Sequence, residues 1–223
     1  MPISSTPPFP RTQPVILLTG FEPFGGALTN PSAEIARALD GTRAGGHRIA
    51  GAVLPCVFGG ARRELARLLR RHRPAVVVCL GVAEGRVAIT PERVAINLED
   101  ARIPDNAGAQ PCDRPVVRGG PAAYWSTLPV KAMVAALARH GIPASVSHTA
   151  GTFVCNHLFY SLLHAVRSRP VRAGFIHVPA AVARPSRRAP GLPLPTQIRA
   201  VQLVLEVAAR RRRDLRRAGG SEH

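Results

Sequence analysis

Residues 75–81 read Ala75-Val-Val-Val-Cys-Leu-Gly81, a short apolar run that ends at a glycine, and this stretch decides the fold. An apolar run of this length without polar alternation is typical of a strand that is buried on both faces. Residues 61–71, just before it, place leucines on one side and arginines on the other, which predicts an amphipathic helix. A helix that leads into a buried strand indicates a βαβ unit and hence a parallel sheet.

The same alternation of strands and helices continues in both directions along the chain. We expect further strands at 15–18, 48–54, 144–149 and 174–178, and strands or a hairpin with an ordered loop over 87–108. We expect further helices from Pro31 and at 130–140, 156–167 and about 196–217. The pattern predicts an α/β fold: a central twisted, mostly parallel (mixed) sheet with helices on both faces, in a single domain over residues 1–223.

The composition limits the classes of protein to consider. The chain has 223 residues, of which 46% are hydrophobic, enough for a packed core, and no apolar run long enough to span a bilayer. Residues 1–13 are rich in Pro, Ser and Thr without the apolar segment of a secretory signal, so we expect a flexible tail and a cytoplasmic protein. The four cysteines form no CxxC pair, so we expect no zinc cluster, and in a reducing cytoplasm we expect free thiols. We expect no cofactor.

The net charge of +17 raises the question of a nucleic-acid partner. The arginines are mostly scattered, apart from a basic C-terminal end over 210–223, and no nucleic-acid-binding motif accompanies them. We therefore do not expect nucleic acid as a partner. A basic nucleic-acid-binding protein on an inactive enzyme scaffold remains an alternative.

Cys155 is the candidate nucleophile. It follows the predicted strand at 144–149 and opens the next helix, while His177 comes at the end of a later strand. Because parallel strands present their carboxyl ends at one edge of the sheet, we expect the two side chains to meet there. The helix N-terminus should lower the pKa of the thiol and favour the thiolate. A buried structural cysteine is the alternative.

His177 is the best candidate for the base. His157 lies two residues from the cysteine on the same helix, and residues at that spacing point to different sides, so we expect a structural role for it. A carboxylate should orient the base. Spacing alone does not choose among the four candidates, which are Glu92, Glu99, Asp100 and Asp105. Glu92 stands in an apolar stretch and must be either functional or paired, for which the adjacent Arg93 is available.

Four blocks of sequence together resemble the pyroglutamyl-peptidase I family of cysteine peptidases, also called pyrrolidone-carboxylate peptidases. They are Leu18-Thr-Gly-Phe-Glu-Pro-Phe-Gly-Gly26 with Asn30-Pro31, residues 85–106, residues 120–129, and Thr149-Ala-Gly-Thr-Phe-Val-Cys-Asn-His157 with His177. The blocks occur in this order over most of the chain, so they are far more specific than one short motif.

The resemblance implies a triad of Cys155 as nucleophile, His177 as base and then acid, and Glu92 as the orienting carboxylate. It implies an exopeptidase (omega-peptidase) that acts on peptides with an N-terminal 5-oxoproline, needs no metal, and forms a small homo-oligomer, usually a tetramer. Arg86 is a candidate to help stabilise the oxyanion. The implied substrate-binding residues are Phe21, Phe24, Phe153, Val154, Val82, Ile103 and Cys56.

The sequence also departs from the family pattern at two places. Val82 stands where the family often has glutamine, and Ala180-Ala-Val-Ala-Arg184 replaces an aromatic and polar stretch. These departures leave open a related cysteine amidase with a shifted substrate.

Overall fold

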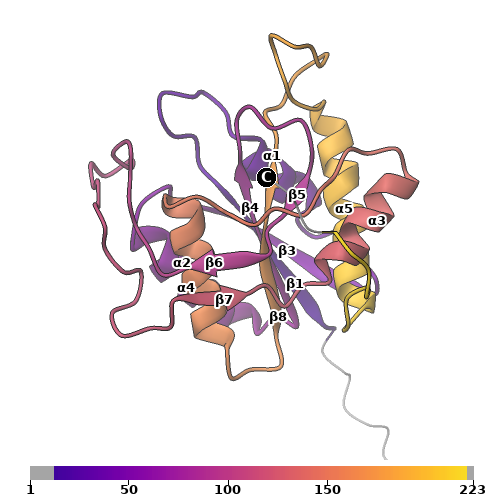
Figure 1. Cartoon of the computed structure of the whole chain (residues 1–223). Coiled ribbons are helices and arrows are strands. Elements are labelled where there is room, and N and C mark those ends of the chain that lie inside the picture. Colours follow the sequence, from indigo (N-terminus) through magenta and orange to yellow (C-terminus); the bar gives the residue numbers. More distant parts are fainter. Residues whose placement is uncertain (1–12, 220–223) are drawn as a thin grey trace, which may run out of the picture.

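The fold is built around a six-stranded sheet with the strand order β2-β3-β1-β4-β8-β5 (Figure 1). The computed structural model of the chain describes residues 13–219. In chain order the elements are β1 Val15–Phe21, α1 Pro31–Leu39, β2 Arg43–Ala44, β3 His47–Leu54, α2 Gly60–His72, β4 Val76–Val82, β5 Thr90–Pro91, β6 Val94–Ile96, β7 Ala123–Trp125, α3 Val130–Arg139, α4 Val154–Val166, β8 Arg172–Val178 and α5 Leu194–Arg210.

The sheet is mixed and mostly parallel, as predicted. The four central strands β3, β1, β4 and β8 run parallel, and the short edge strands β2 and β5 pair antiparallel with their neighbours. Helices α1, α3 and α5 pack over one face and α2 and α4 over the other, each with its own apolar core. Strand β4 lies between β1 and β8, and its residues Val76–Leu80 are fully buried, as the apolar run indicated.

The loop between β1 and α1 is fixed by polar contacts at its far end. The Asn30 side chain accepts the N–H of Ser32, and Pro31 occupies the first turn, so α1 begins where the sequence predicts. Helix α1 then packs so closely on β1 that a Cβ at Gly20 would lie 2.1 Å from the carbonyl oxygen of Ser32. Both contacts hold the loop over 22–29 beside the carboxyl end of the sheet.

The predicted strand at 144–149 is wrong. This segment makes only two isolated bridges, from Ala144 to Ile89 and from Ser147 to Glu92. Backbone bonds still join the segment to residues 89–93: the N–H of Ser147 donates to the carbonyl of Pro91, and the N–H of Arg93 donates to the carbonyl of Ser147. The pairing is interrupted between the two bridges, so no continuous strand forms.

The last helix is shorter than predicted. α5 ends at Arg210 rather than near Arg217, because Arg211 is extended with φ −105° and ψ 126°. Like charges repel along a helix, which disfavours a continuous arginine run. Beyond the helix, the two carboxylate oxygens of Asp214 accept the N–H groups of Lys131 and Ala132 and so cap the start of α3. Residues 1–12 of the predicted tail and residues 220–223 of the basic end lie outside the described residues.

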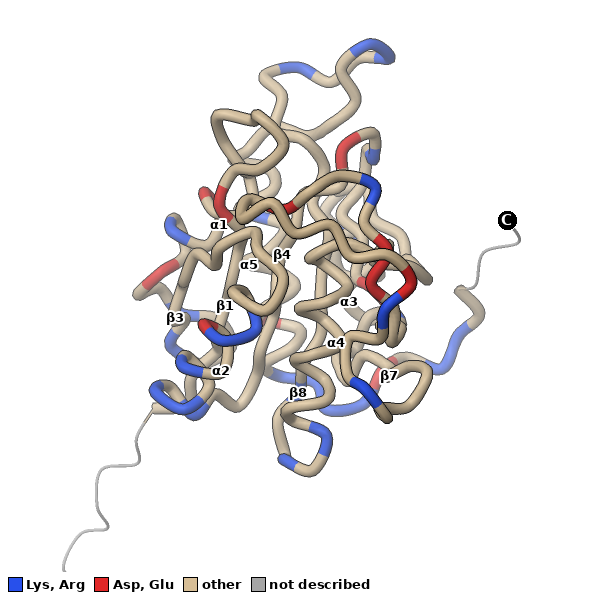
Figure 2. Tube along the Cα trace, turned by 90° about the vertical axis from the view of Figure 1, so that its left-hand side faces the viewer, with Lys and Arg blue, Asp and Glu red and all other residues tan. Residues whose placement is uncertain are grey.

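Positive charge is distributed over several parts of the surface. Figure 2 shows Lys and Arg on loops at both ends of the molecule as well as along its lower edge. One arginine, Arg93, lies with its guanidinium carbon 5.9 Å from the ring centroid of Trp125, which is 69% exposed on β7.

Among residues 13–219, no helix combines the length and the apolar character that crossing a membrane requires.

Candidate active site

Cys155 and His177 lie on the same face of the sheet, next to Gly81. Gly81 of β4 pairs directly with His177 of β8, and paired residues on neighbouring strands share a face. A Cβ at Gly81 would lie 2.8 Å from the Sγ atom of Cys155 and 2.9 Å from the Phe175 ring. The thiol therefore occupies the space that the glycine leaves free, beside the imidazole on the adjacent strand.

Glu92 lies against the other side of His177. Its Oε1 atom is 2.7 Å from Nδ1 of the imidazole, and the carboxylate is completely buried. Because an ionised carboxylate only accepts hydrogen bonds, Nδ1 carries the proton and Nε2 is left as the acceptor. Within residues 13–219, neither the thiol nor another group forms a hydrogen bond with Nε2, so proton transfer requires a closer approach.

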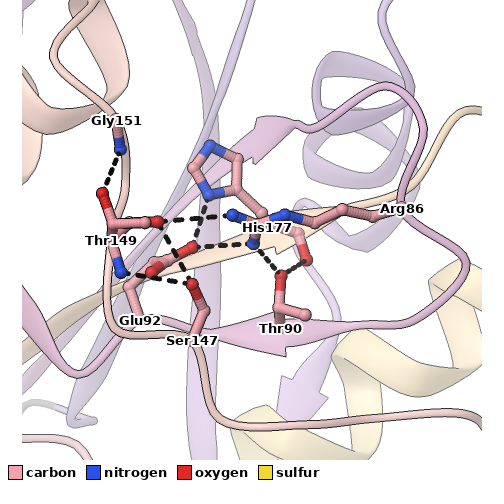
Figure 3. A network of polar contacts seen from close by, with 7 residues as sticks. All are labelled: Arg86, Thr90, Glu92, Ser147, Thr149, Gly151 and His177. Carbon is pink, nitrogen blue, oxygen red and sulfur yellow. Dashed lines mark hydrogen bonds and ion pairs between the residues drawn. The ribbon is translucent and has the colours of Figure 1, made fainter. Parts of the chain in front are cut away.

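Arg86 binds the same carboxylate oxygen as the imidazole (Figure 3). Its Nη1 atom is 3.0 Å from Oε1 of Glu92 and 2.5 Å from the Thr90 hydroxyl, while Nη2 donates to the carbonyl of Thr149. From the sequence, Arg86 was a candidate for the oxyanion and Arg93 a candidate partner of Glu92. Arg86 pairs with Glu92, whereas Arg93 pairs with Asp214 at 3.6 Å, so the expected pairing of Glu92 with Arg93 is wrong. A role of Arg86 at the oxyanion stays a prediction.

The other three candidate carboxylates do not reach His177. Glu99 is bonded to His157, with 2.6 Å between Oε1 and Nδ1. Asp105 accepts backbone N–H groups of its own loop and that of Phe58, and Asp100 is exposed. His157 uses its second nitrogen as well, since Nε2 accepts the N–H of Gly59 at 3.2 Å. His157 therefore cannot serve as a base, whereas His177 has a nitrogen to spare.

The environment of Cys155 raises the pKa of its thiol, contrary to the expectation from the helix N-terminus. Burial is the main cause; Cys56 and Glu92 act in the same direction, and the nearby charge of Arg86 opposes them. Removing a thiolate from water outweighs the favourable position at the start of α4. The thiol is therefore protonated at neutral pH, and a nucleophile is formed only with the help of a base.

The apolar residues implied by the resemblance fall into two groups. Phe21, Val154 and Cys56 are buried in the core on the α2 and α4 side of the sheet. Phe21 lies beyond the strand predicted at 15–18, but β1 extends to it, and its ring packs 6.4 Å from that of Phe175. Burial also raises the pKa of Cys56, to about 12.

The second group is more accessible. The Phe24 and Phe153 rings are half-buried and 6.0 Å apart, and Ile103 is 38% exposed. Phe58, which the sequence analysis did not identify, stands edge-on to Phe153 at 5.3 Å. The rings of Phe24, Phe58 and Phe153 form an aromatic wall near Cys155.

The two departures from the family pattern lie together. Val82 and Ala180 line one cavity of about 170 Å³, which Phe24 also lines. A larger cavity of about 730 Å³ borders Arg86 and Thr90 and the segment 145–149. The role of Thr90 and the close packing of Gly81 against the thiol were not predicted from the sequence. A signal for Gly81 was available, since it ends a buried strand at the edge where the candidate residues were expected.

Comparisons with known proteins agree with this geometry. The sequence profile described as pyroglutamyl peptidase matches residues 15–211. Pyrrolidone-carboxylate peptidases of Chromobacterium violaceum and Bacillus cytotoxicus are 53% and 47% identical over 211 and 212 residues, which cover 93% of this chain and 99% of each relative. The crystal structure of pyroglutamyl peptidase I from Bacillus amyloliquefaciens superposes with a TM-score of 0.89 at 43% identity, covering 93% of this chain and all of the other.

A pyrrolidone carboxyl peptidase of Pyrococcus furiosus superposes with a TM-score of 0.83 at 41% identity, covering 87% of this chain and 97% of the other. The alternative of a basic nucleic-acid-binding protein finds no support among these relatives. The family profile spans nearly the whole described chain and covers the positions of Cys155, His177 and Glu92. The chain therefore belongs to the pyroglutamyl peptidase family of cysteine hydrolases.

Proposed function

We propose that this chain is a cysteine exopeptidase that hydrolyses the bond after an N-terminal pyroglutamyl residue of a peptide. One observation carries the proposal: the Cys155 thiol lies over Gly81, beside an imidazole whose far nitrogen is held by a buried carboxylate. Membership of the pyroglutamyl peptidase family supplies the substrate class.

In the first step, Sγ of Cys155 attacks the carbonyl carbon of the pyroglutamyl residue. Nε2 of His177 takes the thiol proton during the attack, because the raised pKa of the buried thiol leaves little thiolate beforehand. Glu92 stabilises the resulting imidazolium through the bond at Nδ1. Arg86 balances the charge of Glu92 in its buried position.

The start of α4 supplies a site for the oxyanion. No side chain caps this helix, so the backbone N–H groups at its first turn face the position where the carbonyl oxygen becomes negative. His177 then gives its proton to the departing amine, and a thioester between Cys155 and the pyroglutamyl group remains. A water molecule, deprotonated by His177, attacks this thioester, releases 5-oxoproline and restores the thiol.

The aromatic wall suits the substrate. A pyroglutamyl group is a flat, neutral lactam, and the half-buried rings of Phe24, Phe58 and Phe153 offer an apolar surface for it. Prolyl peptides have the same ring size but lack the ring carbonyl and carry a charged amine. An apolar site that offers no carboxylate to that amine should reject them.

The test is the hydrolysis of a fluorogenic pyroglutamyl amide by the purified chain. We expect turnover of this substrate, none of the prolyl analogue, and none by Cys155→Ala, whose circular dichroism should match the wild type. A panel of other N-terminally blocked amides examines the departures at Val82 and Ala180. Equal turnover by Cys155→Ala, or preference for another blocked amide, would disprove the proposed activity.

We further propose that the chain forms one catalytic domain and works in the cytoplasm. We also propose that it assembles as a homo-oligomer, which the family resemblance suggests is a tetramer. Leu28 and Val87 are 95% and 57% exposed, and apolar side chains of this kind favour contacts between copies. A reducing compartment keeps the Cys155 thiol competent. Analytical ultracentrifugation tests the assembly, and a single monomeric species at micromolar concentration would contradict it.

A further inference from the structure

The first turn of α4 carries a second buried histidine–carboxylate pair, formed by His157 and Glu99. His157 is 4% exposed and Glu99 5% exposed, and their Nδ1 and Oε1 atoms are 2.6 Å apart. Burial raises the pKa of Glu99, but hydrogen bonds from His157 and Arg114 outweigh it and leave the pKa below its ordinary value. Glu99 is therefore ionised, and it accepts a strong, charge-assisted hydrogen bond from His157.

The other nitrogen of His157 holds a different part of the chain. Nε2 accepts the backbone N–H of Gly59, so this nitrogen carries no proton and the ring is fixed as the Nδ1–H tautomer. The Phe58 ring stands edge-on to the imidazole, with 5.5 Å between the centroids. One side chain thus ties α4 to the segment over 56–60 and to the loop that begins at Glu99.

That loop, residues 98–114, lies at the left of Figure 1 beside α2 and α4. Backbone bonds between Glu99 and Arg114 close it at its base. Farther out, Asp105 accepts the N–H of Phe58 at 2.8 Å and Asn106 donates its N–H to the carbonyl of Cys56 at 3.1 Å. The loop and the 56–60 segment are therefore bonded to each other as one unit, and His157 bonds this unit to the first turn of α4, which contains Cys155.

This unit carries Phe58 of the aromatic wall, together with two further residues that the family resemblance implies for the pocket. Phe58 contacts Phe153 edge-on, Cys56 lies at the other end of the same segment, and Ile103 lies on the 98–114 loop. The thiol and its base belong instead to α4 and β8, whose positions depend on the central sheet. A change at the attachment should therefore alter the pocket more than the chemical step.

We infer that His157 is a positioning residue, which sets the substrate pocket by holding the 98–114 loop and the 56–60 segment against the start of α4. The inference rests on the proposed pyroglutamyl-peptidase activity and adds the residue that controls substrate affinity. Its two nitrogens act separately: Nδ1–H holds the loop through Glu99, and Nε2 holds the 56–60 segment through Gly59.

Two isosteric variants separate the two contacts. His157→Asn places an amide N–H near the Nδ1 position and retains the donor to Glu99, whereas His157→Gln places an amide oxygen near Nε2 and retains the acceptor for Gly59. For each variant we expect KM for the fluorogenic pyroglutamyl amide to rise about tenfold, as for the loss of one hydrogen bond of this kind, with kcat within about threefold. His157→Ala should have a larger effect on KM than either.

Hydrogen exchange followed by mass spectrometry gives a readout that does not depend on activity. Peptides of the 98–114 loop should exchange faster in His157→Asn and His157→Gln than in the wild type, with the loop more affected in the glutamine variant. His164→Gln is the matched control, because His164 lies on the same helix but bonds to the Tyr124 hydroxyl on the distant small sheet. It should leave both KM and loop exchange unchanged.

Glu99→Ala breaks the same link from the loop side without touching α4, and it covers the case in which the His157 variants do not fold. Unchanged KM and unchanged loop exchange in these variants would overturn the inference, as would a loss in kcat with constant KM and constant exchange. An inactive wild-type protein would disprove the proposed function alone, because faster loop exchange in the variants would still establish the attachment.

Discussion

Glu92→Gln isolates the charge of the buried carboxylate while keeping its shape. When His177 accepts the thiol proton, its positive charge lies about 4 Å from the carboxylate charge, given the 2.7 Å between Nδ1 and Oε1. At an effective dielectric constant of about 20, two unit charges at this separation attract with about 4 kcal/mol. Loss of that stabilisation in the transition state corresponds to a fall in kcat of about 10³-fold.

The structure gives no compensation for the lost charge. Arg86, 3.0 Å from the same oxygen, would remain positive next to the imidazolium and would add repulsion. The assay is kcat and KM for the fluorogenic pyroglutamyl amide near neutral pH, with thermal unfolding by circular dichroism as the check on folding. We expect KM to change little, because Glu92 faces the imidazole and does not belong to the aromatic wall.

Glu99→Gln is the matched control for Glu92→Gln. It removes the charge from another buried carboxylate that binds the Nδ1 atom of a histidine, at 2.6 Å, and its amide oxygen can still accept that hydrogen bond. We expect kcat within about threefold of the wild type. A folded Glu92→Gln enzyme that keeps kcat within about threefold as well would refute the role of Glu92 and leave its burial without a catalytic reason.

Three further predictions concern the sheet, the core and α3. In Gly81→Ala the new Cβ would lie 2.8 Å from Sγ of Cys155. We therefore expect kcat/KM for the pyroglutamyl amide to fall at least about tenfold and the free energy of unfolding to fall by about 1–3 kcal/mol. A variant with full activity would contradict this packing. Burial raises the pKa of Cys79 from 9.0 to about 12, so the unfolded state releases this proton first and the free energy of unfolding should fall as the pH rises from about 9 to 12. Urea titrations at several pH values should show that the free energy of unfolding falls more steeply with pH in the wild type than in Cys79→Val. Equal pH slopes would exclude the buried Cys79 thiol as the cause. Asp214→Ala removes the cap of α3 and should lower the free energy of unfolding by about 1 kcal/mol without changing kcat, and an unchanged urea midpoint would show that the cap is not needed.

The regular parts of the fold could be predicted because their signals are local. The run at 75–81 and the leucine spacing at 61–71 are periodic patterns, and β4 and α2 appear where they indicated. The end of α5 was not predictable in this way, because the chain after it bonds through Asp214 to the start of α3, about eighty residues earlier in the sequence. The strand prediction at 144–149 failed for a related reason. The composition of this segment suits a strand, but it forms only isolated bridges, with Ile89 and Glu92.

The candidate site was predictable in part. His177 lies at the carboxyl end of β8, as predicted from the rule that parallel strands present their carboxyl ends at one edge. Cys155 lies next to Gly81 at the same edge, although the strand predicted before it does not form. Apart from the family resemblance, the sequence did not choose Glu92 over Glu99, because both are buried carboxylates and only the three-dimensional pairing with His177 or His157 separates them. The pKa of Cys155 was also out of reach, since the depth of burial depends on the packing of α4 against the sheet.

The exposed position of Trp125 has a practical consequence. It is the only tryptophan of the chain, and it lies on the small sheet with Arg93 over its ring rather than in either apolar core. Its emission in the native protein should already resemble that of an indole in water, so the spectrum should shift little on denaturation. Conversely, quenching by iodide or a change in emission would signal an event at this outer edge, such as contact with another copy, and would make the natural fluorophore a probe of assembly.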